Sequence, residues 1–314
     1  MPRMNKSSAS FPLLVILGPT ASGKSALAVE LARKFNGEVV SADSRQVYRD
    51  LNVGTGKITR REMKGVRHHL LDVAEPKRRF TVQKYKELAE KAIDDIHSRG
   101  KLPILCGGTG FYIDAVVNDL EFPAVKANKK LRARLAKKSL DELLKILEKL
   151  DPSRARAIQN SASERNNARR IIRAIEIASH SGTVPSLKKT GSKYDAFFIG
   201  LKTEPVELRK RIHSRLLKRL KAGMLAEARR LNSEGLSWKR MEELGLEYRF
   251  MARFLQGKTT REETIRQLDI AIGQYARRQM TWFRRNKNIE WHQLPVSVSK
   301  LSHSVAHFLH KTRN

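Results

Sequence analysis

The chain has 314 residues, 40% of them hydrophobic and 30% charged, which is typical of a globular protein with a large core. Its 63 lysines and arginines outnumber its 32 acidic residues and leave a net charge of +31. Because such an excess costs stability through self-repulsion, it indicates a polyanionic partner, nucleic acid first, although a generally lysine-rich proteome would also account for it.

Cysteine content and hydropathy narrow the class further. Cys106, the single cysteine, excludes an internal disulfide and a cysteine-based zinc site, so we expect the reducing cytoplasm as the compartment. The apolar run Leu13–Leu17 is too short for a membrane span or a signal-peptide core, and no membrane association is expected. Residues 1–10 are predicted to be a short disordered tail.

The first motif in chain order is a phosphate-binding loop between a strand and a helix. The predicted strand Leu13–Leu17 leads into GPTASGKS, and an amphipathic stretch at helical spacing follows. The glycines let several backbone N–H groups point at one anion, Lys24 adds a positive charge, and the Ser25 hydroxyl can hold Mg²⁺. The residues of this loop are Gly18, Pro19, Thr20, Ala21, Ser22, Gly23, Lys24 and Ser25.

Strands and helices alternate through the next part of the chain. We predict a strand at 38–42 ending in Asp43, a strand with its approach loop at 65–73, a helix from 82 to 100, and a strand at 102–106 followed by Gly107-Gly108-Thr109-Gly110. This alternation predicts an α/β fold, a P-loop NTPase-like parallel sheet with helices on both faces. Ligand groups lie at the carboxyl ends of such strands, so residues 18–25, Asp43 and Thr109 should face one crevice.

The sequence changes character near residue 123. Residues 126–193 are helix-forming and contain 18 basic and 6 acidic residues, and a strand signal returns at 196–201. We therefore predict a helical insertion domain, 123–193, within a P-loop α/β core of residues 11–122 and 194–314 that ends in helices. A long helix beginning near Pro205 carries a row of Arg211, Arg215 and Arg219, which either is solvated or faces the crevice.

Three groups of residues allow more than one interpretation. Asp43 could help hold magnesium, act as a general base, or cap the next segment. His68 and His69 face opposite ways on a strand, which favours structural roles over metal binding. Trp282 and Phe283 lie among arginines and suit either base stacking beside phosphate contacts or the core of a terminal helix.

Seven segments together resemble one protein family. In chain order they are GPTASGKS, VVSADSRQVY, GVRHHLLDV, CGGTGFYI, RNNARRIIRAIEI, LRKRIHSRLLKRLKAGML and QYARRQMTWFRR. The ordered set resembles the tRNA dimethylallyltransferases, also called tRNA isopentenyltransferases, over nearly all of residues 11–290. The phosphate loop alone is unspecific, whereas SADSRQVY and RRQMTWFRR in this order are specific. No cysteine/histidine extension like that of some eukaryotic relatives is present, so the bacterial type is expected.

The resemblance implies an enzyme, a prenyltransferase. It would transfer a dimethylallyl group from dimethylallyl diphosphate to the exocyclic N6 amine of the adenosine adjacent to the anticodon in tRNA and release diphosphate. The family likeness makes Asp43 the base that accepts the amine proton. The diphosphate would be bound by residues 18–25, with Mg²⁺ on Ser25, and its leaving would be stabilised by Thr20, Lys24 and Arg215. The resemblance thus makes Asp43, Thr20 and Arg215 the catalytic residues.

The resemblance also implies contacts with the anticodon stem-loop of tRNA, whose target base must leave the stack and enter the protein. The helical insertion would close over one side of the loop. No obligate protein partner is expected, and a monomer is the simplest state. The implied contact residues are Asp43, Ser44, Arg45, Gln46, Thr109, Arg132, Arg169, Arg170, Ile171, Ile172, Arg173, Arg277, Arg278, Gln279, Trp282 and Arg284.

Two segments depart from the family pattern, and three other functions compete. Arg67 stands where the family commonly has proline, and LGLEYR separates Gly245 from Tyr248, which weakens the expectation of a tRNA contact at 244–249. An adenylate isopentenyltransferase would use the same core on a free nucleotide but would not need the basic insertion. A P-loop kinase would need an arginine-rich lid. A basic RNA-binding protein with a vestigial phosphate loop would not need Lys24 and Asp43 intact.

Overall fold

The computed structural model describes residues 11–161, 164–188 and 191–312, so the tail predicted at 1–10 lies outside the described residues. The chain divides into two compact units. The first combines Met1–Asp119 with Gly191–Asn314, and the second is Leu120–Thr190. The boundaries at 120 and 190 fall beside the predicted boundaries of the insertion, 123 and 193.

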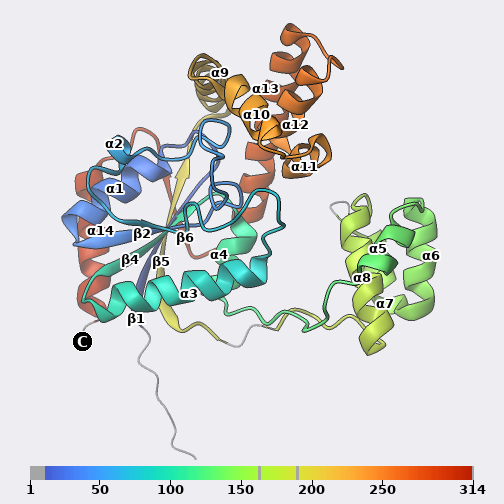
Figure 1. The fold of residues 1–314 in the computed structure, drawn as a ribbon. Coiled ribbons are helices and arrows are strands. Elements are labelled where there is room, and N and C mark those ends of the chain that lie inside the picture. The colour runs from blue at the N-terminus through green and yellow to red at the C-terminus, as the bar shows by residue number, and fades with distance from the viewer. Residues whose placement is uncertain (1–10, 162–163, 189–190, 313–314) are drawn as a thin grey trace, which may run out of the picture. The chain divides into compact units, whose positions relative to one another are not determined.

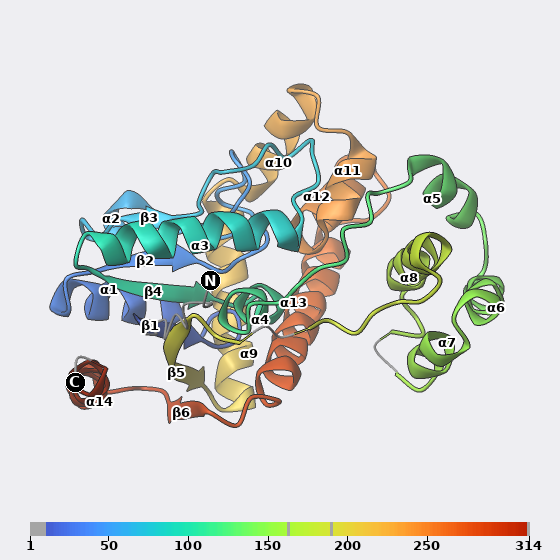
Figure 2. The same ribbon diagram turned by 90° about the horizontal axis from the view of Figure 1, so that it is seen from below.

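The first unit is built on a six-stranded sheet, and all the described strand pairs in it are parallel. Figure 2 shows the strands side by side in the order β3-β2-β4-β1-β5-β6. The continuous burial of β4 and most of β1 explains their apolar sequences, because helices cover both faces of the sheet. The predicted α/β fold is confirmed. The strands are β1 (Phe11–Leu17), β2 (Gly37–Ser41), β3 (His68–His69), β4 (Leu102–Gly107), β5 (Tyr194–Lys202) and β6 (Ile289–Gln293).

The strand predicted within residues 65–73 is much shorter than that segment. Only His68 and His69 pair with β2. Gly65 precedes them with φ 82°, and Leu70 and Asp72 follow with φ 62° and 58°. These left-handed conformations cannot continue an extended strand, so β3 ends after two residues.

Helices cover both faces of this sheet, as Figure 1 shows. On one face, α1 (Lys24–Lys34) and α14 (Val298–Lys311) contribute buried residues such as Leu31 and Leu301 to a core with β1 and β4. On the other face, α3 (Val82–Ser98) and α4 (Gly110–Val117) bury Tyr85 and Ile113. The burial of both faces leaves the carboxyl ends of the strands as the place for ligands.

A second layer of helices lies beyond these carboxyl ends (Figure 1). The helix predicted near Pro205 is confirmed, with proline in its first turn, where no backbone N–H is needed. Ile212, Leu216, Met251 and Leu268 form its shared core. The helices of this region are α9 (Pro205–Lys221), α10 (Met224–Ser233), α11 (Trp238–Leu244), α12 (Leu246–Leu255) and α13 (Arg261–Phe283), and the short α2 (Arg60–Met63) lies earlier in the chain.

The second unit is helical. Leu143, Leu147, Ile158, Ile171 and Ile175 are buried in its own core. Each helix begins at a polar residue whose side chain accepts a backbone N–H of the first turn, which satisfies part of the helix end. Its helices are α5 (Lys129–Leu135), α6 (Leu140–Leu150), α7 (Pro152–Gln159) and α8 (Ala168–Ser181). In the described parts of both units, no helix is long and apolar enough to cross a membrane.

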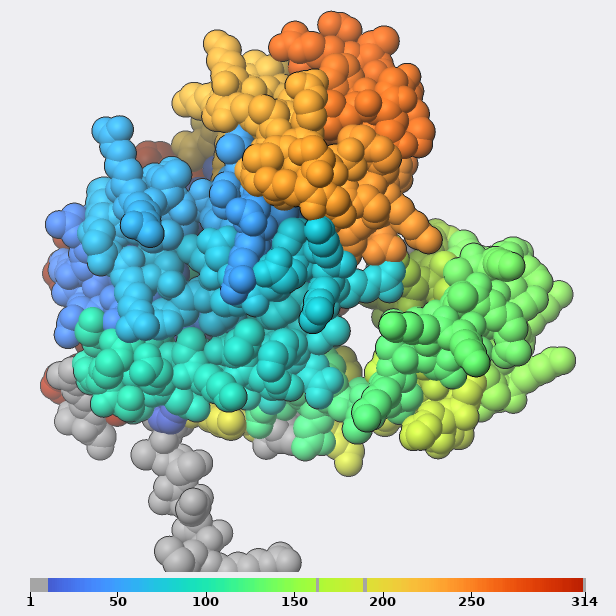
Figure 3. Space-filling view, viewed as in Figure 1, coloured from blue at the N-terminus to red at the C-terminus, as the bar shows by residue number. Residues whose placement is uncertain are grey.

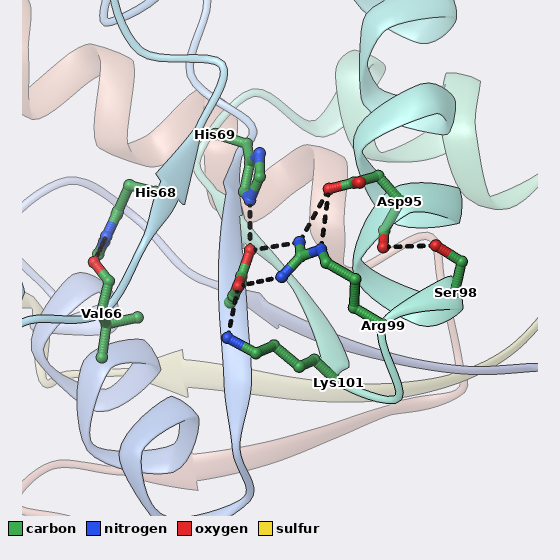
Figure 4. Close-up of polar contacts among 8 residues, drawn as sticks. Val66, His68, His69, Asp95, Ser98, Arg99 and Lys101 are labelled. Atoms are coloured by element: carbon green, nitrogen blue, oxygen red, sulfur yellow. Dashed lines mark hydrogen bonds and ion pairs between the residues drawn. The ribbon is translucent and has the colours of Figure 1, made fainter.

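A buried carboxylate stabilises the amino-terminal end of the sheet (Figure 4). Glu38 of β2 is 2% exposed and accepts two hydrogen bonds from Arg99, at 2.6 and 2.8 Å, and one from Lys101 at 2.8 Å. His69 Nε2 lies 2.7 Å from the same carboxylate, and Arg99 also binds Asp95 of α3. The hydrogen bonds from Arg99 hold the pKa of Glu38 well below its usual range. His69 therefore has the structural role that its sequence position favours.

Candidate active site

The carboxyl ends of β1, β2 and β4 bring three loops together. β4 pairs with both β1 and β2, so the residues that follow each strand are neighbours. The Thr109 N–H donates to Ala42 O at 3.1 Å, and the Ser44 N–H donates to Thr109 Oγ1 at 3.0 Å. The segments after β2 and β4 are thus joined by hydrogen bonds beside the phosphate loop that follows β1.

The phosphate loop, residues 18–25, folds back on its own lysine. Lys24 is the first residue of α1, and its Nζ donates to Pro19 O at 3.1 Å. Ala21 at φ 62° and Gly23 at φ 79° provide the left-handed turns of the loop. First-turn N–H groups without helical partners thus lie beside a cation, which is the arrangement that binds phosphate groups at helix N-termini.

Two half-buried cations, Lys24 and Arg215, lie at this loop. Arg215 of α9 has its Nη1 3.5 Å from Thr20 Oγ1, and its Nη2 donates to Gly56 O at 3.0 Å. Burial lowers the pKa of Lys24, and the nearby charge of Arg215 acts in the same direction. Burial also lowers the pKa of Arg215, assisted by Arg219. Because burial disfavours both charges, a bound anion would stabilise them.

The arginine row of α9 divides between solvent and the interior. Arg211 pairs with Glu207 at 2.9 Å within its own helix. Arg215 reaches the phosphate loop, and Arg219 Nη1 donates at 2.8 Å to both Gly54 O and Glu247. The sequence left open whether this row is solvated or faces the crevice. Arg211 is on the solvated side, whereas Arg215 and Arg219 point toward the interior.

Asp43 is held by a turn of its own segment. Its Oδ1 accepts the backbone N–H groups of Arg45 at 2.8 Å and Gln46 at 3.3 Å, so the capping interpretation describes its local geometry. The half-buried carboxylate also acts on the cations, because its charge favours the protonated forms of Lys24 and Arg215. A capped carboxylate at this position remains able to accept a proton from a ligand.

Tyr275 is a residue of this region that sequence reasoning missed. It is half-buried on α13, and its hydroxyl interacts with Thr109. Burial raises the pKa of Tyr275 to about 12, and the charge of Asp43 adds to the effect. Helical spacing could have indicated it, because Tyr275, Gln279 and Trp282 lie at positions i, i+4 and i+7 on one face of α13.

Gln279 is placed differently from its predicted role as a tRNA contact. Its side chain is 6% exposed, its Oε1 accepts the Thr20 N–H at 2.9 Å, and its Nε2 donates to Gly108 O at 2.8 Å. Both ends of the amide are thus bound within the protein. We correct the prediction accordingly: the side chain joins α13 to the phosphate loop and to the segment after β4.

The aromatic pair of α13 divides between two environments. Phe283 is 3% exposed and belongs to the core of the first unit. Trp282 is half-buried, its Nε1 donates to Asp114 Oδ2 at 2.8 Å, and the Arg285 guanidinium lies 5.0 Å from its ring centre. The core interpretation therefore describes Phe283, while Trp282 keeps a partly accessible ring.

The basic residues of α13 face in different directions. Arg277 and Arg284 line a groove of 1170 Å³ between α9 and α13, together with Ile212 and Met280. Arg278, the next residue after Arg277, is exposed on a different face of the helix. Two of the three arginines thus line the groove, and all three are exposed.

The predicted contacts in the second unit also divide. Arg169 and Arg170 are exposed, and Arg170 pairs with Glu164 at 3.1 Å. The side chains predicted to contact tRNA at positions 171 and 172 are buried, Ile171 fully and Ile172 with 8% exposed. The prediction for these two side chains is wrong, because the apolar row of α8 faces the core of its own unit.

Arg132 and Arg173 are tied to a buried carboxylate in this unit. Arg132 donates to Glu176 at 2.9 and 2.6 Å, and Arg173 donates to the same carboxylate and to Val125 O. Burial opposes the charge of Glu176, but its hydrogen bonds prevail and lower its pKa to about 2. These arginines therefore stabilise the unit. About a third of each side chain is exposed, and this part remains available to a ligand.

The described residues offer few protein ligands for a metal ion. Among the residues that the structure describes, no three histidine, cysteine or acidic side chains gather around one point. Ser25 is exposed in the first turn of α1, and His68 Nδ1 lies 2.9 Å from Val66 O. Magnesium commonly takes one or two protein oxygens and completes its shell with substrate phosphates and water, which suits Ser25.

The fold and the site define a P-loop protein of the α/β class, in which the charge of a carboxylate after the second strand acts on the lysine of the phosphate loop. The chain belongs to the IPP transferase family, whose profile matches residues 46–286. It is 44% identical to tRNA dimethylallyltransferase 2 of Trichlorobacter lovleyi, covering 89% of this chain and 90% of that protein. It is 39% identical to the tRNA dimethylallyltransferase of Pediococcus pentosaceus, covering 95% and 96%.

Solved structures give the same result. The full-length tRNA isopentenylpyrophosphate transferase of Bacillus halodurans is similar, with a TM-score of 0.73 and 36% identity, and 96% of this chain and 98% of that chain are covered. A eukaryotic dimethylallyltransferase acting on tRNA is similar at a TM-score of 0.75 and 28% identity, covering 90% of this chain and 74% of that chain. The resemblance drawn from the seven sequence segments is confirmed.

Proposed function

We propose that the protein transfers a dimethylallyl group from dimethylallyl diphosphate to N6 of the adenosine adjacent to the anticodon of tRNA. One observation carries the proposal: the half-buried cations Lys24 and Arg215 both lie at a phosphate loop, and Asp43 lies at the end of a nearby strand. The relatives from Trichlorobacter lovleyi and Pediococcus pentosaceus are named as tRNA dimethylallyltransferases, which supports dimethylallyl transfer to tRNA. The net charge of +31 suits an RNA substrate.

The diphosphate would occupy the phosphate loop. During transfer the bond between C1 of the allyl group and the diphosphate oxygen breaks, and both electrons leave with the diphosphate. Backbone N–H groups of residues 18–25, Lys24 and Arg215 would stabilise the negative charge of this leaving group, with Thr20 Oγ1 beside it. Because both cations are half-buried, their attraction for the diphosphate is stronger than it would be in water.

The adenosine amine needs a proton acceptor. Its lone pair is delocalised into the ring, so the amine is a weak nucleophile until its proton begins to leave. As the N6–C1 bond forms, the Asp43 carboxylate would take that proton. The N–H groups of Arg45 and Gln46 hold the carboxylate in one orientation, which limits the reorganisation the step requires.

Ser25 would hold Mg²⁺ together with the diphosphate. When bound, the ion would neutralise part of the charge that develops on the leaving group. The exposure of Ser25 and its position in the first turn of α1 support this assignment. The other magnesium ligands would be substrate oxygens and water.

The tRNA contacts that we retain are side chains with exposed charge or an accessible ring. They belong to both compact units, and the target base would be extruded from the anticodon loop to reach Asp43. We propose that the protein acts as a cytoplasmic monomer, which size-exclusion chromatography with light scattering would test. The retained side chains are Arg169, Arg170, Arg277, Arg278, Trp282 and Arg284, with Ser44, Arg45, Gln46 and Thr109 near the target base.

A transfer assay tests the proposed function. Purified protein is mixed with dimethylallyl diphosphate, Mg²⁺ and an unmodified tRNA that has adenosine beside its anticodon, and the anticodon-loop mass is measured. We expect one dimethylallyl group on that adenosine and a rate about 10²- to 10⁴-fold lower for Asp43→Ala. A tRNA without that adenosine should stay unmodified. Transfer to free AMP would identify an adenylate isopentenyltransferase, and tight tRNA binding without transfer would leave only an RNA-binding function.

A further inference from the structure

The loop Asn52–Gly56, here called the 52–56 loop, is held by a buried carboxylate of α10. Glu227 is 8% exposed and accepts three consecutive backbone N–H groups, those of Asn52 at 2.9 Å, Val53 at 2.8 Å and Gly54 at 2.9 Å. The hydroxyl of Tyr248 on α12 donates to the same carboxylate at 2.7 Å. In Figure 3 the blue segment near residue 50 lies against the yellow and orange helices. Three of its four donors are thus backbone N–H groups of the 52–56 loop, and the fourth is the Tyr248 hydroxyl.

The carbonyl groups of the 52–56 loop face the arginines of α9. Gly56 O accepts from Arg215 Nη2 at 3.0 Å, and Gly54 O accepts from Arg219 at 2.8 Å. Gln46 Nε2 also donates to Gly56 O, at 3.4 Å. Residues assigned to the two substrates, Arg215 for the diphosphate and Gln46 for the nucleotide, therefore share one backbone acceptor.

We propose that Glu227 is a positioning residue for Arg215. By binding the N–H side of the 52–56 loop, it fixes the Gly56 carbonyl that directs the guanidinium of Arg215 toward Thr20. The inference rests on the proposed function, because it requires that Arg215 bind the diphosphate. Arg215 needs such a partner, since a long side chain loses its orientation when one directed hydrogen bond is removed.

The packing around the loop supports this role. Gly56 has φ +57°, and a Cβ there would lie 2.4 Å from Arg215 Nη2, so the guanidinium approaches the backbone as closely as glycine allows. A Cβ at Gly54 would lie 2.6 Å from the ring of Tyr248. Both glycines thus serve close contacts, one with the arginine and the other with the tyrosine that binds Glu227.

The segment LGLEYR, which departs from the family pattern, contributes to the same arrangement. Glu247 pairs with Arg219 at 2.8 Å, and its charge also acts on Arg215. Tyr248 is 2% exposed and donates to Glu227. The two side chains at these positions therefore serve the 52–56 loop and its arginines, which gives this segment a role inside the protein.

A double-mutant cycle between Glu227→Gln and Arg215→Gln tests the proposal, with Glu234→Gln as the matched control. Glu234 directly follows α10 and is exposed, and its carboxylate pairs with Arg230 of that helix. Transfer rates are measured with dimethylallyl diphosphate and tRNA, and binding of inorganic diphosphate is measured by calorimetry. We expect Glu227→Gln to lower kcat/KM for the diphosphate substrate by about 10- to 100-fold, with tRNA affinity unchanged. Glu227→Gln should cause no further loss, within about twofold, when Arg215→Gln is already present.

Losses that multiply in the double variant would overturn the proposal, because they would show that Glu227 acts independently of Arg215. Tyr248→Phe removes one donor from Glu227 and leaves its three backbone bonds, so it tests the same coupling if Glu227→Gln does not fold. Measuring diphosphate binding distinguishes failure of the proposed function from failure of the positioning role of Glu227. If the wild type binds diphosphate but does not transfer, the proposed function fails, while equal weakening of diphosphate binding by Glu227→Gln and Arg215→Gln would still support the positioning role.

Discussion

Gln279 shows how a single buried amide can join parts of the site that are far apart in sequence. Its carbonyl binds the backbone of Thr20, and its amino group binds Gly108. The phosphate loop and the loop after β4 are therefore held at a set distance by α13. A polar side chain with both ends occupied in this way stabilises the arrangement of the site, and little of it is left to recognise RNA.

Replacing Gln279 with leucine should destabilise the fold. The nearly equal volume fills the site, but the Thr20 N–H and Gly108 O lose their partners, which costs about 1–3 kcal/mol. Urea unfolding at neutral pH should show this loss in the free energy of unfolding. Gln274→Leu on the exposed side of the same helix is the control and should change it by less than about 0.5 kcal/mol. A stable Gln279→Leu variant with weakened tRNA binding would instead restore the original prediction of an RNA contact.

At the scale of elements, periodicity and burial were sufficient to predict most strands and helices. The apolar runs of β1, β4 and β5 are buried on both faces, which makes them visible in the sequence. The extent of β3 could not be predicted, because the left-handed conformation that ends it occurs at Leu70, a residue type that rarely adopts it.

The candidate site could be predicted only where a local pattern carries it. GPTASGKS and Asp43 are visible because each follows a buried strand. The roles of Glu227 and Tyr275 could not be recognised in the sequence, since an acidic residue or a tyrosine on an amphipathic helix resembles many others. Their roles depend on partners more than 160 residues away in the chain, which periodicity cannot reveal.

The Glu38 cluster at the amino-terminal end of the sheet should make stability depend on pH. The pKa of Glu38 in the folded protein is depressed below its ordinary value of 4.5. Its contribution to the free energy of unfolding is therefore fully present above pH 4.5 and is lost as the pH falls below that value. Glu38→Gln should cost about 2 kcal/mol at pH 7, since hydrogen bonds to a charged group are lost.

Denaturant unfolding of the wild type and Glu38→Gln between pH 7 and pH 3 checks this expectation. The difference between the two proteins should shrink below pH 4.5, because Glu38 of the unfolded chain takes up a proton there while the carboxylate of the folded protein stays ionised. Glu87→Gln removes an exposed pair with Lys84 and should have little effect at any pH. A difference between the wild type and Glu38→Gln that stays constant down to pH 3 would show that packing, and not charge, accounts for the role of Glu38.

At the scale of the whole molecule, the excess charge is spread over both units, and its local roles differ. Some basic side chains are tied to buried carboxylates, as Arg132 is to Glu176 and Arg99 is to Glu38. Others, such as Arg169 and Arg278, are exposed. The pairs stabilise the fold, so the exposed side chains are the ones available to neutralise phosphates of a polyanion.

Binding of tRNA should therefore weaken steeply with salt. If six to ten phosphates are neutralised, affinity should fall by about 10³- to 10⁵-fold between 50 and 200 mM salt. Arg169→Ala should reduce the slope of log affinity against log salt by about one while leaving unfolding unchanged. Arg132→Ala should lower the stability of the second unit instead, because it leaves part of the Glu176 carboxylate without its donors. A wild-type affinity that hardly responds to salt would contradict the assignment of the +31 charge to RNA and would favour a small nucleotide as the substrate.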